Sequence, residues 1–365
     1  MTMPVSSSPH AHAGSSVNRI MVDVCAALIP CTAMGFYLFG WPAAWLWFVT
    51  VLAAVVADAV CLQLRGKSPR DVLDGSALLT GWLIAMTLPP WAPWWIGVGG
   101  SLFAIVIGKQ LYGGVGQNIF NPAMLARVGL LIAFPLQMTT WIMPLPFAGL
   151  EHPDLVAGWN ITFGTQPALD GYTGATALGE LKTAMTIPLK AGDVLEEHYV
   201  WWQALLGLHS GSMGETSELL VLLGGIWLLM RRIISWEIPL AVLLTLAFMT
   251  STAAIVNPDR YAGALFHLTS GGVMLGAFFI ATDPVTSPIS RVGKLIFGAG
   301  CAAVIFVIRN WGSFPEAVGF AVLFMNALTP LLDRYFKPRV YGRNFRGKPL
   351  PVTQSRVVMD HRRKS

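Results

Sequence analysis

The chain has 365 residues, of which 54% are hydrophobic and only 12% are charged, with a formal net charge of +5. A soluble domain carries about 25% charged residues, so this chain has too little charge to cover a surface that faces water. The composition excludes an ordinary soluble fold and predicts an all-α polytopic membrane protein. The 14 tryptophans and 24 prolines agree, because membrane interfaces favour Trp and membrane helices tolerate Pro.

In chain order, a polar tail at residues 1–19 precedes a series of apolar segments. A membrane helix needs about 20 apolar residues, and about ten segments approach that length. They cover residues 20–39, 41–62, 74–89, 93–111, 122–138, 217–231, 237–256, 262–282, 293–309 and 314–333. The sequence therefore predicts a first membrane unit at 20–138 and a second at 214–336.

Two segments outside the spans differ in charge. Residues 139–213 hold seven acids and two lysines, a net charge of −5, whereas the tail at 337–365 holds nine basic residues and one acid, a net charge of +8. Short basic loops around Arg65, Arg231 and Arg291 fall on the same side as that tail if the spans are right. Cytoplasmic loops are enriched in Lys and Arg, so both termini are expected in the cytoplasm and 139–213 in the periplasm.

The two membrane units share a sequence pattern. Residues 79–89 run parallel to residues 274–284 at a shift of 195, keeping a glycine (Gly81 and Gly276) and a proline (Pro89 and Pro284) in register. Five spans in each unit make the second unit upside down relative to the first. The prediction is two inverted five-helix repeats, an arrangement that in transporters places a site near the bilayer midplane.

Two polar segments could carry chemistry. Residues 113–123 form a glycine-rich loop in which Asn121 is expected to cap a helix that begins at Pro122; a simple turn between spans is the equal alternative. Residues 170–176 read Asp-Gly-Tyr-Thr-Gly-Ala-Thr within the acidic insert. Taken alone, that segment is typical of a surface turn.

Ionisable residues within spans mark ion or cofactor paths. Asp58 and His267 are the more internal ones, and Asp283 lies where a predicted helix is interrupted. Asp58 and Asp283 are the candidates for an ion path, although Asp283 could instead cap the helix junction.

With these motifs the chain resembles a known family. Residues 170–176 are similar to the flavinylation motif, Asp-x-x-Ser/Thr-Gly-Ala-Thr, of two related membrane proteins. These are RnfD of the Rnf complex and NqrB of the sodium-translocating NADH:quinone oxidoreductase. Further matching segments cover most of residues 18–342, including Thr80-Gly81, Gly211 to Ser217 and Asn310-Trp311-Gly312. The short N-terminus favours the RnfD branch, and the basic tail after Gly342 has no match.

The resemblance implies a cofactor and its attachment. In that family the last Thr of the motif, here Thr176, carries FMN through a phosphoester that a separate flavin transferase installs. Gly174 and Ala175 would allow close approach, and Thr173 is the competing acceptor. The sister protein NqrB also carries riboflavin, for which no residue here can be assigned. No metal ligand is expected.

The resemblance also implies a function. The chain would be an inner-membrane electron relay, not catalytic by itself, in a complex with electron-input, iron–sulfur and second flavin subunits. That complex couples electron transfer to translocation of Na⁺ or H⁺. The alternative is a non-redox channel or carrier, because five plus five inverted spans also look like the urea-transporter architecture. No nucleic acid is expected as a partner.

Overall fold

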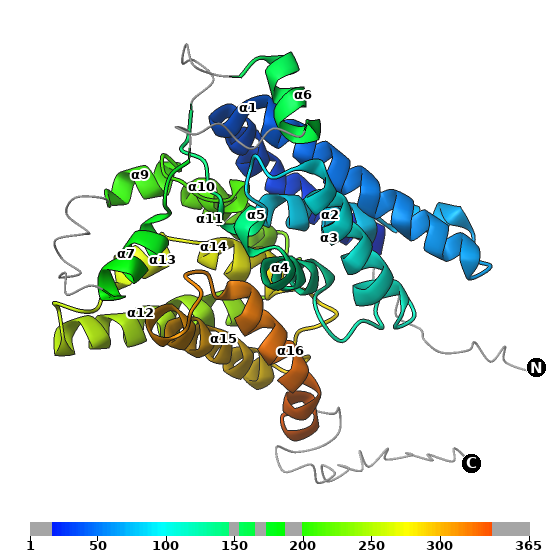
Figure 1. Cartoon of the computed structure of the whole chain (residues 1–365). Coiled ribbons are helices and arrows are strands. Elements are labelled where there is room, and N and C mark those ends of the chain that lie inside the picture. Colours follow the sequence, from blue (N-terminus) through cyan, green and yellow to red (C-terminus); the bar gives the residue numbers. More distant parts are fainter. Residues whose placement is uncertain (1–16, 146–152, 165–172, 187–198, 338–365) are drawn as a thin grey trace, which may run out of the picture.

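The computed structural model describes residues 17–145, 153–164, 173–186 and 199–337. Across these residues the chain is helical, and the extended pairing is limited to an isolated bridge between Ile142 and Thr173. The all-α expectation is therefore confirmed for the described part of the chain. Figure 1 shows the helices gathered into one bundle.

The first membrane unit contains the longest helix. Its elements are α1 (Val17–Leu64), η1 (Pro69–Asp74), α2 (Ser76–Thr87), α3 (Trp94–Leu102), the π-helical η2 (Phe103–Gln110), α4 (Pro122–Ala133) and α5 (Pro135–Thr139). Gly40 interrupts α1 with φ 71° and ψ −154°, a conformation open to glycine alone. The two spans expected at 20–39 and 41–62 therefore form one kinked element that is broken at Gly40.

Asn121 caps α4 as the sequence predicts. Its side-chain oxygen accepts hydrogen bonds from the backbone N–H groups of Ala123 at 3.1 Å and Met124 at 3.2 Å, and Pro122 occupies the first turn. The cap fixes where the helix begins, because Pro122 supplies no N–H and needs none there.

The second unit extends from α11 to α16. It consists of α11 (Glu218–Met230), α12 (Glu237–Val256), α13 (Ala264–Leu268), α14 (Val273–Leu275), the π-helical η3 (Gly276–Ile280), α15 (Arg291–Trp311) and α16 (Val318–Tyr335). The span expected at 262–282 is thus broken into three short pieces around Gly271, whose φ of 70° favours glycine.

Within the described residues, three helices are long and apolar enough to cross a membrane: α1, α12 and α15. Three shorter apolar helices accompany them: α2, α4 and α11. Large apolar side chains such as Phe248, Leu244 and Ile255 point outward from α12 and are 60–82% exposed. An apolar exterior of this kind requires lipid.

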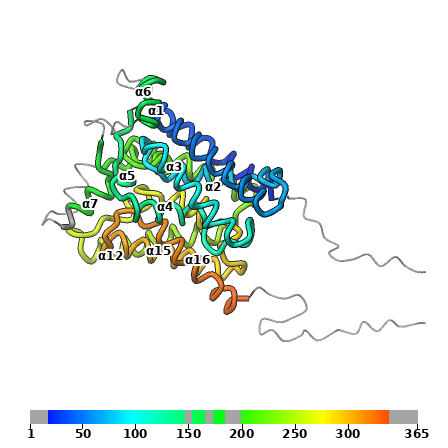
Figure 2. The backbone as a smooth tube through the Cα atoms, turned by 45° about the vertical axis from the view of Figure 1, so that its right-hand side comes forward, coloured from blue at the N-terminus to red at the C-terminus, as the bar shows by residue number. Residues whose placement is uncertain are grey.

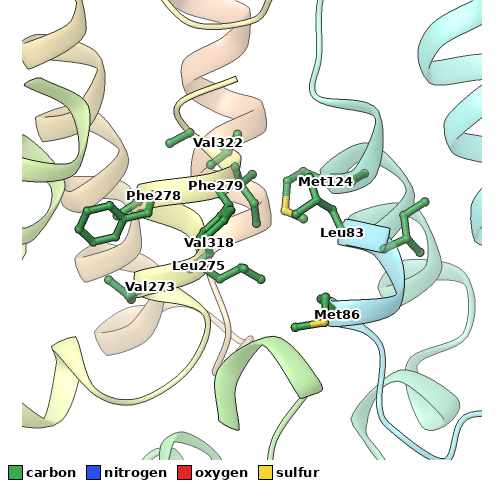
Figure 3. Packing of buried hydrophobic residues seen from close by; sticks show 14 of the residues in the cluster. Leu83, Met86, Met124, Val273, Leu275, Phe278, Phe279, Val318 and Val322 are labelled. Carbon is green, nitrogen blue, oxygen red and sulfur yellow. The ribbon is translucent and has the colours of Figure 1, made fainter. Parts of the chain in front are cut away.

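The core lies where the two units meet. Side chains from α2 and α4 approach side chains from α14, η3 and α16 there (Figure 3). Gly224 and Gly225 bring α11 close to its neighbours, since a Cβ at Gly224 would lie 2.6 Å from the Ala27 carbonyl oxygen and one at Gly225 2.4 Å from the Phe278 ring. Small residues at such crossings allow membrane helices to pack closely.

In the described parts of the connecting segment, four short helices join the two units: α6 (Leu155–Phe163), α7 (Ala177–Thr186), α9 (Trp201–Leu206) and α10 (Met213–Thr216). In both overall views α7 lies at one end of the bundle and the end of α16 at the opposite end (Figures 1 and 2). The segment predicted as an insert therefore contributes helices to one end of the bundle.

Candidate functional site

Residues 173–176, the part of the predicted flavinylation motif that the structure describes, begin as an extended segment. Thr173 pairs with Ile142, and the Gly174 N–H donates to the Trp141 carbonyl oxygen at 3.0 Å. A Cβ at Gly174 would lie 2.8 Å from both Met143 Cγ and Ser210 Oγ, so a larger residue there would push these neighbours apart. Residues 170–172 of the motif lie outside the described residues.

Thr176 ends this segment and begins α7. Its Oγ1 accepts a hydrogen bond from the Gly179 N–H at 3.1 Å, and its carbonyl oxygen accepts one from the Glu180 N–H at 2.9 Å. The Thr176 side chain is half-buried, whereas Thr173 is exposed. Thr176 is therefore the N-cap of α7, with its hydroxyl oxygen at the positive end of the helix.

A cavity of about 330 Å³ adjoins this cap. The residues on either side of Thr176, Ala175 and Ala177, line it, as does Glu180 one turn further along α7. Its other walls combine apolar and polar side chains from the described residues: Met143, Pro144, Tyr199, Val200, Gln203, Ala204, Leu208, His209, Ser210 and Ser270.

Lys182 attaches α7 to the end of α15. Its Nζ donates to the carbonyl oxygens of Ile308 at 3.1 Å, Arg309 at 3.4 Å and Phe314 at 2.9 Å. The last carbonyls of a helix lack partners within the helix and attract cations. On the same helix, Leu178 and Leu181 pack with Ala262 and Phe266 in a small apolar cluster. Helix α7 is therefore held by both polar and apolar contacts.

Buried charges lie beneath α7, where the two units join. Arg127 of α4 forms an ion pair with Glu316 at 3.2 Å, their side chains being 7% and 19% exposed. Glu316 also accepts the Gly272 N–H at 3.0 Å, while Arg309 donates to the carbonyl oxygens of His267 and Ser270, both at 2.7 Å. These bonds compensate for taking the charges out of water.

Two further acids belong to this region. Glu215 and Glu218 are 4% and 2% exposed, and neither carboxylate oxygen of Glu218 has a hydrogen-bond partner within the described part of the chain. Sequence reasoning used residues 211–217 for the resemblance alone and gave these acids no role. Glu218 could have been found as an acid within the predicted span 217–231, since ionisable residues within spans were the signal that singled out Asp58.

Asp58 is 1% exposed, and both of its carboxylate oxygens accept hydrogen bonds. It accepts from Lys109 Nζ at 2.9 Å and from Gln110 Nε2 at 2.6 Å, and Lys109 also donates to Ser76 Oγ at 2.7 Å. The structure therefore joins two ionisable residues of the sequence, Asp58 and Lys109, into one neutral pair.

Asp283 caps the junction after η3. Its two carboxylate oxygens accept from the Val285 N–H and the Thr286 hydroxyl, each at 3.1 Å. It also lines a cavity of about 80 Å³ between the two units, which Lys109 and Asn121 border as well. This cavity shares no described lining residue with the one beside Thr176. The residues predicted from the sequence thus lie at two separate sites. Thr173–Thr176 lie beside the cavity of about 330 Å³, and Asp58 and Asp283 lie near the cavity of about 80 Å³.

The buried ion pair yields a stability prediction. Replacing Arg127 by Met should leave Glu316 without its cation, and losing one partner of a buried pair costs about 3–5 kcal/mol. Thermal unfolding of the purified protein in detergent measures the loss. Arg231→Gln is the matched control, because the Arg231–Asp23 pair spans 3.3 Å with the Arg side chain 44% exposed. Equal melting temperatures for the two variants would contradict a structural role for the Arg127–Glu316 pair.

The chain was then compared with known proteins. The family model described as "NQR2, RnfD, RnfE family" matches residues 4–342. Proteins named as the D subunit of an ion-translocating oxidoreductase complex are similar over most of their length: one from Stutzerimonas stutzeri is 63% identical, over 92% of this chain and 95% of its own. Those from Halorhodospira halophila and Rhodobacter capsulatus are 49% and 48% identical, over 94% and 84% of this chain and 96% and 86% of their own. The chain therefore belongs to the NQR2, RnfD, RnfE family.

Proposed function

We propose that this chain is the membrane subunit of an ion-translocating oxidoreductase complex and that it carries FMN on Thr176. The relatives bear the name of a subunit of such a complex. The observation that carries the cofactor assignment is the position of Thr176, a helix cap that lies between two residues lining a cavity. In the complex the chain would act as an electron relay beside electron-input, iron–sulfur and second flavin subunits.

The surroundings of Thr176 fit a phosphoester. A phosphoester at this oxygen would place a negative charge at the N-terminus of α7, where free N–H groups and the helix dipole favour anions. Thr173 lacks both features, because it lies in the extended segment and not at a helix start. The hydroxyl of a Thr is a poor nucleophile without an activating base, so activation is assigned to the flavin transferase. The chain itself presents the acceptor.

The bound flavin would supply the redox chemistry, and the protein would fix its position and tune its potential. Lys182 holds α7 on the end of α15, and Leu178 packs at Gly271 beside the buried charges. A Cβ at Gly271 would lie 2.6 Å from Leu178 Cδ1 and 2.7 Å from Arg309. The acceptor would therefore be attached rigidly to the membrane part and not to a free loop.

The distribution of basic residues supports an orientation. Arg65 follows the end of α1, Arg231 follows α11 and pairs with Asp23 near the start of α1, and Arg291 begins α15. In the proposed topology these positions share one end of the bundle. By the positive-inside rule, that end would face the cytoplasm and Thr176 the periplasm. Residues 79–89, at the end of α2, and residues 274–284, at α14 and η3, share a sequence pattern that supports two inverted five-helix units, the second beginning near α11.

The ion path would pass between these units. Asp283 lines the cavity between them, and Asp58 contacts its border through Lys109. Intramembrane carboxylates beside interrupted helices are suited to binding cations or protons. A plain channel of urea-transporter-like architecture would need no acceptor threonine, and the relatives' names favour the redox function.

Fusion to alkaline phosphatase tests the orientation. A fusion near Gly158 should be active, because the enzyme folds in the periplasm, and a fusion after Gly342 should be silent. The reverse pattern would refute the proposed topology.

Flavin attachment is tested by in-gel fluorescence of the denatured chain from cells that express the transferase. Thr176→Ala should abolish the covalent signal, since it removes the acceptor oxygen. Thr173→Ala is the matched control and should retain it. If the covalent fluorescence is lost in the Thr173 variant and retained in the Thr176 variant, Thr173 is the acceptor and the assignment to Thr176 is wrong.

The ion path is tested by transport into vesicles. Asp283→Asn should lower transport by about tenfold, which corresponds to about 1.4 kcal/mol, while covalent flavin persists. The double variant Asp58→Asn with Lys109→Met removes both charges of the pair together, so that no buried lysine is left unpaired, and should act in the same direction. Asp71→Asn, at an exposed site in η1, is the control. Unchanged transport in both test variants would exclude these acids from the path.

A further inference from the structure

His209 lines the cavity beside Thr176 and is unusual among its walls. Both ring nitrogens are buried, and neither has a hydrogen-bond partner within the described residues. A buried polar group left without a partner costs about 1–3 kcal/mol. Such a group in a cavity wall points to a ligand that completes its hydrogen bonds.

The protonation state of the His209 imidazole limits which chemical groups the ligand can present to it. Burial lowers the pKa of His209 to about 4, so the ring is neutral at pH 7. A neutral imidazole offers one donor and one acceptor. It therefore matches a group that carries acceptors and donors along one edge better than it matches a phosphate.

Tyr199 forms another wall. Its hydroxyl hydrogen-bonds to the Thr269 hydroxyl, and its ring meets Phe266 edge-to-face with centroids 5.0 Å apart. These contacts fix the ring at the cavity. With Val200 and Leu208 it provides apolar surface, whereas Gln203, His209 and Ser210 provide polar surface. The cavity therefore has a mixed lining suited to a flat molecule with an apolar body and a polar edge.

Size and position agree with this chemistry. Ligand pockets have volumes of about 300–1,000 Å³, and the cavity of about 330 Å³ lies at the lower limit. Ala175 and Ala177 border it on either side of the proposed attachment point. A ring tethered at Thr176 through a flexible ribityl phosphate would have this cavity beside its point of attachment.

We propose that the cavity receives the isoalloxazine ring of the FMN on Thr176, with His209 hydrogen-bonded to the polar pyrimidine edge and Tyr199 packed against the ring. The inference rests on the proposed function and adds to it the residues that position the ring. Because hydrogen bonds to the pyrimidine edge stabilise the reduced and oxidised flavin differently, His209 would be a positioning residue that also sets the potential.

The test uses the purified complex, with every signal expressed per covalent flavin. His209→Leu should change the equilibrium between oxidised and reduced Thr176 flavin by about tenfold, or about 59 mV for a one-electron couple, in a spectroelectrochemical titration. His209→Gln, which restores a donor and an acceptor, should recover most of the shift. A structural role alone would not produce this recovery.

Fluorescence of the native complex gives a second readout. Tyr199→Leu should brighten the flavin, because a stacked tyrosine quenches it by donating an electron to the excited ring, whereas Tyr199→Trp, which keeps an aromatic electron donor at the ring, should retain much of the quenching. Trp202→Leu, on the neighbouring helix with its side chain 45% exposed and outside the cavity lining, is the matched control. Potentials and fluorescence that stay at wild-type values with the covalent flavin intact would overturn the inference and leave the proposed function standing. Absence of flavin from wild-type Thr176 would overturn both.

Discussion

The burial of charge inside an apolar helix bundle is the constraint on which the structure depends. Lipid and close-packed helices offer no water, so a buried ion is costly unless a partner within the protein compensates it. Arg127 and Glu316 meet this requirement across the two membrane units, at 3.2 Å. Arg309 meets it with the carbonyl oxygens of His267 and Ser270, which are free to accept because the chain breaks between α13 and α14. The interrupted helix and the buried arginine thus require each other.

Residues 173–176 and α7 contact that arrangement. Lys182 uses the carbonyls at the end of the helix that carries Arg309, and the Gly174 N–H binds Trp141, whose ring lies 5.7 Å from the Arg127 guanidinium. Thr176 is therefore linked to both membrane units through a few contacts. A flavin at this position would be held beside buried charges, where a nearby ionisation state affects its potential more strongly than it would in water.

Local signals in the sequence predicted much of the fold. Hydropathy located the helices, the gap between the spans expected at 20–39 and 41–62 coincided with the break at Gly40, and Asn121 with Pro122 gave the correct start of α4. Long-range pairing was not predictable. Lys109 lies 51 positions from Asp58, and Arg127 lies 189 from Glu316, and no local pattern encodes such partners. The helices α6, α7 and α9 were also missed, because they are short and lack the hydropathy of a span. Helix α7 is held by tertiary contacts: Lys182 hydrogen-bonds to carbonyl oxygens at the end of α15, and Leu178 and Leu181 pack in a small apolar cluster.

The central claim is that Thr176 carries the flavin. Intact-mass and tandem mass spectrometry of the chain, purified from cells that express the flavin transferase, tests it most directly. We expect a mass increase of one FMN less one water, with fragment ions that place it on Thr176 and not on Thr173. An unmodified chain, or a flavin located on another residue, would contradict the claim.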